Sequence, residues 1–120
     1  MNTFDPDTST LYLDQGTDVV IEFTLTDDNS ATLITSGYTA KSQFRTDYTS
    51  KNVVLELSTA NQRIENDNQG NFRLIFAAAT TSAIKASDLD GVFDVEVTDS
   101  FGSTHRVLSG NYSISPEVTR

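Results

Sequence analysis

The chain has 120 residues, no cysteine and a net charge of −9, from 17 acidic and 8 basic residues. This length suits one domain rather than two, the lack of cysteine excludes disulfides and thiolate chemistry, and the acidic balance should repel nucleic acid and anionic membranes. No apolar run approaches the ~20 residues that a membrane span needs.

The first strand signals follow a polar start. Residues 1–10 are polar and acidic, without the basic and apolar stretches of a signal peptide, and we expect them to form a flexible lead-in. Residues 11–13 predict a small edge strand. Residues 19–26 alternate between apolar and polar side chains, which predicts a half-buried strand with Val19, Ile21, Phe23 and Leu25 facing inward.

The middle of the chain predicts two more strands. Residues 38–45 alternate again, with Tyr38, Ala40, Ser42 and Phe44 on one side. Residues 53–57 form a further strand, with Val53, Leu55 and Leu57 inward, after a polar loop at 47–52. Leu33 and Ile34 are expected to cover one end of the core, and 63–65 is a short strand at best.

The strongest turn signal is the run Asn66-Asp67-Asn68-Gln69-Gly70. It leads into a strand with Phe72, Leu74 and Phe76 on one face. The Ala- and Thr-rich residues 77–89 predict one short helical turn that crosses between two sheets, anchored by Ile84 and Leu89.

A closing hairpin is predicted from Gly91 onward. Phe93, Val95 and Val97 face inward, and a tight loop at 99–103 contains Gly102. The return strand begins near Thr104 and continues to Ile114, with a bulge or bend at Ser109-Gly110.

These elements predict an all-β fold. Seven or eight short strands, with turns every 8–12 residues and one short helical crossover, are typical of an antiparallel immunoglobulin-like β-sandwich. A closed barrel is the alternative. The Cys and Trp of antibody domains are absent, so the likeness concerns topology. We expect a single domain over residues 1–120.

The sequence gives no support for an enzyme. His105 is the one histidine, it lies in a predicted strand, and no Gly-x-Ser-x-Gly turn presents a nucleophile, so we interpret it as a surface residue. Zinc would need more His or Cys ligands. We predict no catalytic, cofactor-binding or metal-binding residues and no cofactor.

Three acidic clusters, at 27–29, 66–68 and 88–91, leave a calcium site as the alternative to ordinary turn chemistry. The cluster at 88–91 lacks the closing Glu of a calcium loop. The aromatic side chains Tyr48 and Phe101 lie in predicted loops, where an aromatic either caps the core or anchors a partner. We favour capping.

The last third of the chain contains a distinctive series of residues. The series begins with Gly91-Val92-Phe93-Asp94-Val95-Glu96-Val97-Thr98-Asp99. It continues with Gly102 and His105-Arg106-Val107-Leu108-Ser109-Gly110, and it ends with Ser115-Pro116-Glu117-Val118-Thr119-Arg120. Three earlier segments complete the pattern: Asp14-Gln15-Gly16-Thr17, Gly37-Tyr38-Thr39-Ala40-Lys41 with Phe44-Arg45, and Thr80-Thr81-Ser82. This pattern resembles small immunoglobulin-like β-sandwich proteins of tailed bacteriophages.

The resemblance implies a virion structural protein of the tail, baseplate or fibre region, assembled in the host cytoplasm and acting through protein–protein contacts. Its partners would be other virion proteins and further copies of itself, and the family implies no catalytic residues. A capsid decoration (cement) protein and a receptor- or carbohydrate-binding module remain as alternatives.

Overall fold

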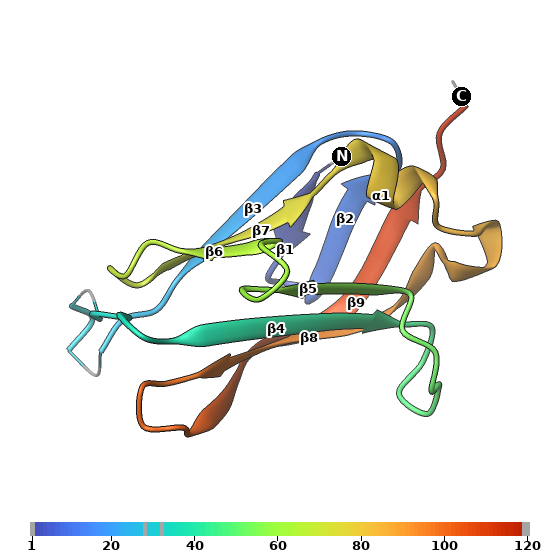
Figure 1. Cartoon of the computed structure of the whole chain (residues 1–120). Helices are drawn as coiled ribbons and strands as arrows, with labels where there is room; N and C mark the ends of the chain where they lie inside the picture. The colour runs from blue at the N-terminus through green and yellow to red at the C-terminus, as the bar shows by residue number, and fades with distance from the viewer. Residues whose placement is uncertain (1, 28, 32, 119–120) are drawn as a thin grey trace.

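The computed structural model describes residues 2–27, 29–31 and 33–118, which fold into two β-sheets packed face to face (Figure 1). Nine strands occur in this part of the chain: β1 (Thr3–Asp5), β2 (Thr10–Asp14), β3 (Val19–Thr24), β4 (Thr39–Arg45), β5 (Leu55–Ser58), β6 (Ile64–Asn66), β7 (Asn71–Phe76), β8 (Asp90–Thr98) and β9 (Thr104–Ser115). A short helix, α1 (Ala78–Ser82), and a 3-10 turn, η1 (Ala86–Asp88), lie between β7 and β8.

The strand order is that of an immunoglobulin-like sandwich. The larger sheet runs β1-β2-β9-β8-β4-β5 and the smaller sheet runs β3-β7-β6. Strands β3, β7 and β6 therefore correspond to strands B, E and D of an immunoglobulin domain, and β4, β8, β9 and β5 to C, F, G and C′. All neighbours are antiparallel except β2 and β9. The predicted sandwich is confirmed, and the sheets do not close into a barrel.

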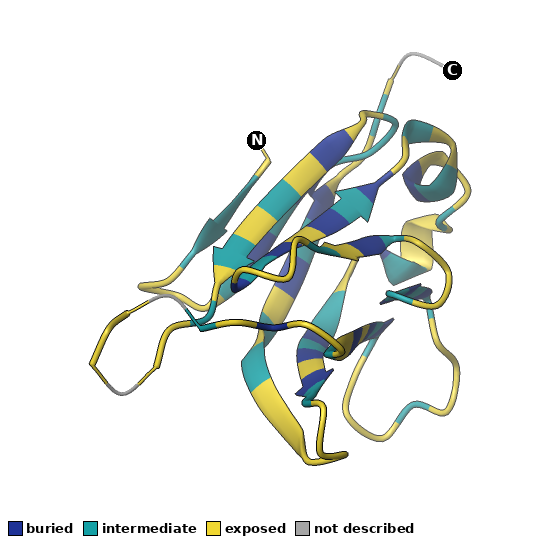
Figure 2. Cartoon of the chain, turned by 60° about the vertical axis from the view of Figure 1, so that its left-hand side comes forward, coloured by how far each residue is buried: buried dark blue, intermediate teal, exposed yellow. Residues whose placement is uncertain are grey.

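The core lies between the sheets, and buried residues alternate with more exposed ones along most of the longer strands, as in β2, β4, β7 and β8 (Figure 2). The inward faces predicted for β7 and β8 are confirmed, because Phe72, Leu74, Phe76, Phe93, Val95 and Val97 are all buried. Phe44 of β4 lies at the centre of the core. Its ring stacks on Phe93 at 5.2 Å between centroids and meets Tyr112 and Phe76 edge-on at 5.3 and 5.8 Å. Phe44 thus joins the two sheets.

The expectation for residues 1–10 is wrong in part. Residues Thr3–Asp5 form β1, which pairs with β2, and Phe4 packs edge-on against Phe93 at 6.2 Å. Strand β2 is not an edge strand, because it lies between β1 and β9. Its parallel partner is about 100 residues away in sequence, and no local pattern reveals such a partner.

The short helical crossing over residues 77–89 is confirmed. Helix α1 and η1 together carry the chain from β7 in the smaller sheet to β8 in the larger one. Leu89 is buried and Ile84 packs against the core, as predicted for the anchors.

The bulge predicted at Ser109-Gly110 is placed wrongly. Strand β9 is continuous there, and the register shift lies where Val95 pairs with Leu108 but Glu96 pairs with Arg106. Gly110 has another role: a Cβ atom added to it would lie 1.9 Å from the carbonyl oxygen of Ser9. That oxygen accepts a 2.9 Å hydrogen bond from the Asn111 N–H, so the glycine permits a close backbone approach.

Two residues expected to face the core are exposed instead. Ile34 is 66% exposed in the long loop between β3 and β4, and Val53 is 41% exposed just before β5. Neither lies in a strand, so the alternation that assigned Val53 to the inner face does not extend to it. In the described ranges no helix is long and apolar enough to cross a membrane.

Candidate functional site

The outer face of the larger sheet gathers charged side chains from neighbouring strands. Since alternate residues of β4 and β8 point into the core, the residues between them point to solvent. Cross-strand pairing places Lys41 opposite Glu96 and Glu96 opposite Arg106. Charges of opposite sign therefore alternate across β4, β8 and β9.

A hydrogen-bonded network holds the β4–β5 side of this face. Glu56 accepts a hydrogen bond from Gln43 at 2.9 Å and pairs with Lys41 at 3.3 Å. The hydrogen bond from Gln43, and then the one from Lys41, lower the pKa of Glu56. Arg45 donates to the Gln43 side-chain oxygen at 2.7 Å and to the Ser50 carbonyl at 2.8 Å. Since its pKa is lowered, the Glu56 carboxylate is ionised at neutral pH and carries the negative charge of this network.

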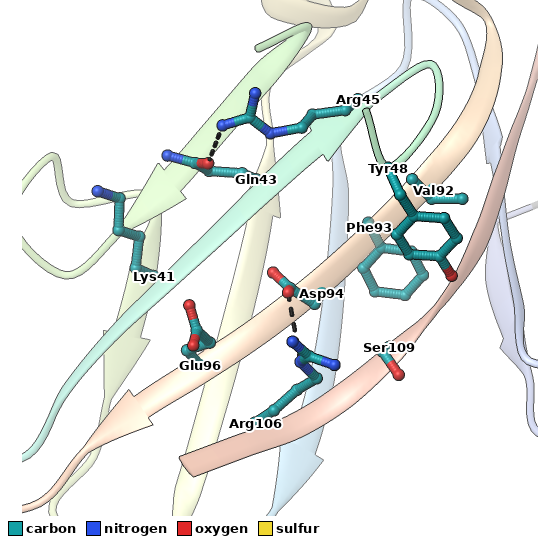
Figure 3. Close-up of a pocket in the computed structure, with 10 residues that line it drawn as sticks. All are labelled: Lys41, Gln43, Arg45, Tyr48, Val92, Phe93, Asp94, Glu96, Arg106 and Ser109. Atoms are coloured by element: carbon teal, nitrogen blue, oxygen red, sulfur yellow. Dashed lines mark hydrogen bonds and ion pairs between the residues drawn. The ribbon is translucent and has the colours of Figure 1, made fainter. Parts of the chain in front are cut away.

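A shallow depression of about 340 Å³ lies between this network and β9 (Figure 3). The ion pair of Asp94 and Arg106, 3.5 Å apart, lies across its floor. Tyr48 stands beside it near Val92, with 81% of its surface exposed. An open depression lined by paired charges and one exposed aromatic ring is suited to surface recognition rather than to enclosing a reacting group.

His105 lies on β9 near the β8–β9 loop, as predicted for a surface strand residue. Its side chain is 63% exposed, and its Nε2 lies 3.5 Å from Asp99 Oδ2. Asp99 in turn accepts hydrogen bonds from the backbone N–H groups of Ser103 and Phe101, which together with His105 lower its pKa. The carboxylate therefore orders a loop.

Two of the three acidic clusters, at 27–29 and 66–68, use their oxygens in the same way. Asp27 Oδ1 accepts from the N–H groups of Asn29 and Ala31, and Asp67 accepts from Gln69 and Asn71. In both turns the Asp side chain accepts hydrogen bonds from backbone N–H groups two to four residues later, as is usual for Asp in turns. Within residues 2–27, 29–31 and 33–118 no group of three or more His, Cys, Asp or Glu side chains could hold a metal ion. Residue 28 of the first cluster lies outside the described residues.

The aromatic loop residues do not cap the core, and that prediction is wrong. Phe101 is 94% exposed and Tyr48 is 81% exposed. Tyr48 follows β4, and Phe101 follows β8, which runs antiparallel to β4. The two rings therefore lie at opposite ends of the larger sheet and do not form one loop cluster.

A second polar cluster joins three segments that are distant in sequence. Gln15 donates from its side-chain amide to the carbonyls of Thr81 and Ile84, both at 3.1 Å, and accepts from the Glu117 N–H at 3.1 Å. Gly16 N–H donates to Thr81 Oγ1 at 2.9 Å. The turn after β2, helix α1 and the C-terminal segment thus form one hydrogen-bonded unit, which the sequence does not reveal because its parts are non-local.

Comparisons with known proteins add no family. No protein-family model and no curated protein matches the chain. Among solved structures, one chain from a photo-crosslinking study of multimeric cell-adhesive interactions of VGSC beta subunits aligns over 90% of both chains. It shares 11% sequence identity, with a TM-score of 0.47, and at this distance it carries no argument about function.

Proposed function

We propose that this domain is a structural protein of a bacteriophage virion, in the tail, baseplate or fibre region, and that it acts through protein–protein contacts. The observation that carries the assembly role is the outer face of the larger sheet. There Glu56, Lys41, Glu96 and Arg106 alternate in sign across four neighbouring strands. Such a charge pattern favours one partner orientation over others, because a shifted partner would place like charges together.

The phage assignment rests on the sequence resemblance, and the polar cluster around Gln15 supports it. Three of the segments that carry the resemblance, 14–17, 80–82 and 115–118, meet in that cluster. Ser82 also donates to the Glu117 carboxylate at 2.7 Å. These three segments of the resemblance are therefore in contact through one hydrogen-bonded cluster.

We propose further that the domain catalyses no reaction and uses no cofactor. On the outer face of the larger sheet, which we call the candidate face, charged groups are engaged with one another: Lys41 pairs with Glu56 and Arg106 pairs with Asp94. Its other partners would be copies of itself, in the closed symmetry that is usual for soluble oligomers. Size-exclusion chromatography with light scattering measures that state directly.

Two further roles remain as alternatives. A capsid decoration protein would use the same face on the shell. A receptor- or carbohydrate-binding module is favoured by the exposed ring of Tyr48 beside the depression, since sugar rings pack on exposed aromatics. A glycan array separates this role: Tyr48→Ala should abolish any glycan binding, and Phe101→Ala, at the other end of the sheet, should leave it intact.

Mass spectrometry of purified particles tests the main proposal. If the chain is a tail, baseplate or fibre protein, it should be present in the particle at low copy number. If it is a capsid decoration protein, it should be present in hundreds of copies. Absence of the chain from the particle would overturn both.

A variant pair then tests the face itself. The double change Lys41→Glu and Arg106→Glu should block incorporation, because it reverses two charges on the candidate face. The matched change Lys51→Glu and Lys85→Glu alters net charge equally at exposed positions off that face and should not.

A further inference from the structure

The edges of the two sheets differ in how their backbone groups are satisfied. An edge strand presents a row of unpaired N–H and C=O groups, which can pair with another chain. The edge strands here are β1 and β5 in the larger sheet and β3 and β6 in the smaller one. Strands β1 and β6 have three residues each, which leaves little backbone to pair.

The edge of β5 is closed by the loop that follows it. Asn61 accepts from the Ser58 N–H at 2.9 Å and donates to the Glu56 carbonyl at 3.1 Å. The Arg63 N–H donates to the Ser58 carbonyl at 3.1 Å. Three of the four outward backbone groups of β5, the Glu56 carbonyl and both groups of Ser58, are therefore occupied within the chain.

The edge of β3 is open. The Leu25 N–H donates to the Gly70 carbonyl at 2.8 Å, and β3 pairs with β7 in this same register from Val19 to Thr24. In an antiparallel pair, alternate residues bond to the partner, so residues 19, 21 and 23 face β7. The bonds from Ile75 to Arg63 and from Asp67 to Asn71 agree, because they direct the other residues of β7 toward β6.

The backbone groups of Val20, Glu22 and Thr24 therefore point away from the sheet. No hydrogen bond to these N–H or C=O groups occurs among the described residues. Val20 is 57% exposed, and the strand contains no proline and no bulge. This six-residue strand offers three free donors and three free acceptors along one edge.

The charge around this edge specifies what can pair with it. Residues 1–40 contain seven acidic residues and no lysine, arginine or histidine. Strand β1, from the same acidic segment, forms the edge of the larger sheet and pairs with β2, the strand that precedes β3 in the chain. Asp18, just before β3, and Glu22 within it have exposed side chains, whereas Ile21 and Phe23 are partly buried against the core. Asp18 accepts a hydrogen bond from the Ala78 N–H at 2.7 Å, and Glu22 pairs at 3.3 Å with Arg73 of β7, the one base opposite this strand among the described residues.

We propose that β3 binds an extended segment of another protein in which apolar and basic residues alternate. The segment adds to the smaller sheet as a fourth strand, its backbone bonding to Val20, Glu22 and Thr24. Its apolar side chains pack beside Ile21 and Phe23, and its basic side chains lie beside the exposed carboxylates of Asp18 and Glu22. A second copy of this chain is disfavoured, since it would bring the same base-free, acidic third of its sequence to the edge. The inference goes beyond the proposed function and does not depend on the virion.

Two synthetic peptides of equal length test the proposal, one alternating valine and lysine and one alternating valine and glutamate. We expect the lysine peptide to bind and to slow amide exchange at residues 20, 22 and 24, as followed by NMR, and the glutamate peptide not to bind. The variant Val20→Pro removes one outward N–H and keeps the fold, because proline is tolerated where the N–H points away from the sheet. It should weaken binding about tenfold. Val20→Ala keeps the N–H and should bind as the parent chain does.

Several results would overturn the inference. They are failure of the lysine peptide to bind, equal binding of both peptides, equal affinity of the two Val20 variants, and peptide-induced shifts at Lys41 and Asp94 in place of β3. Self-association of the free chain that Val20→Pro abolishes would instead identify a second copy as the occupant. Absence of the chain from virions would leave all of these outcomes unaffected.

Discussion

Replacing Phe44 by alanine removes the ring through which the two sheets meet. Phe44 is 1% exposed and contacts three other rings, one of them in the smaller sheet. A buried Phe→Ala change costs about 3–5 kcal/mol, and each aromatic pair contributes about 0.5–1.5 kcal/mol beyond its buried area. Three such pairs place Phe44 at the upper end, at about 4–5 kcal/mol. For a chain of this size the melting temperature should fall by roughly 12–20 °C.

Urea denaturation followed by far-ultraviolet circular dichroism measures this loss. Tyr48→Ala is the matched control, because this exposed aromatic is only four residues away and should change stability by no more than about 0.5 kcal/mol. Where Phe44→Ala does not fold, Phe44→Leu keeps an apolar side chain and reports a smaller loss. A loss below about 1.5 kcal/mol for Phe44→Ala would refute the central position of the ring.

Two other substitutions test contacts that link distant segments. The Tyr112 hydroxyl donates to the Asp88 carbonyl at 2.8 Å, and burial, followed by the charges of Asp88 and Asp90, raises the pKa of Tyr112 to about 12. The folded state thus holds this proton more tightly than the unfolded state. The protonated Tyr112 hydroxyl therefore contributes to the free energy of unfolding fully below pH ~10, and this contribution is lost as the pH rises toward ~12. Urea titrations at pH 7 and at pH 10–11 measure this effect. At pH 7, Tyr112→Phe should be about 1 kcal/mol less stable than the parent chain, and its stability should fall less than that of the parent chain between the two pH values. An equal fall in both proteins would contradict this. Gly110→Ala should cost about 2–3 kcal/mol, because its Cβ would meet the Ser9 carbonyl, whereas the same change at Gly102, with φ +88° and open space, should cost about 1 kcal/mol. Thermal melts that give equal losses at the two glycines would contradict the close approach at Gly110.

Local alternation predicted the inward faces of the strands well. Phe72, Leu74 and Phe76 alternate with Asn71, Arg73 and Ile75, which are less buried, and all three are buried in β7. In a strand, successive side chains point to opposite faces, so a two-residue period in the sequence is enough to assign the buried face. The same reasoning placed Phe93, Val95 and Val97, and the sandwich followed from the number and spacing of such strands.

Features that depend on distant segments could not be predicted from sequence. Strand β1 has a single large apolar residue, Phe4, and so shows no period, yet its pairing with β2 fixes it. A glycine in a strand often marks a bulge, so the sequence predicts one at Gly110, whereas the actual constraint on this residue comes from Ser9.

For the candidate face too, the local sequence predicts which side chains are exposed but not which strands are neighbours. Alternation shows that Lys41, Glu96 and Arg106 face solvent, and only the strand order shows that they are neighbours. Exposure of the Tyr48 and Phe101 rings was missed, because a loop aromatic has the same sequence signature whether it caps the core or faces solvent.

Cross-linking mass spectrometry of intact particles tests the proposed assembly role most directly. Lys41 lies on the candidate face with 57% of its side chain exposed, so a lysine-reactive cross-linker can reach it. We predict cross-links from Lys41 to a different virion protein, and fewer such links from the exposed Lys85 near α1. A particle in which Lys41 forms no link to any other protein, or in which Lys85 forms them in its place, would contradict the assignment of the outer face as the site of assembly.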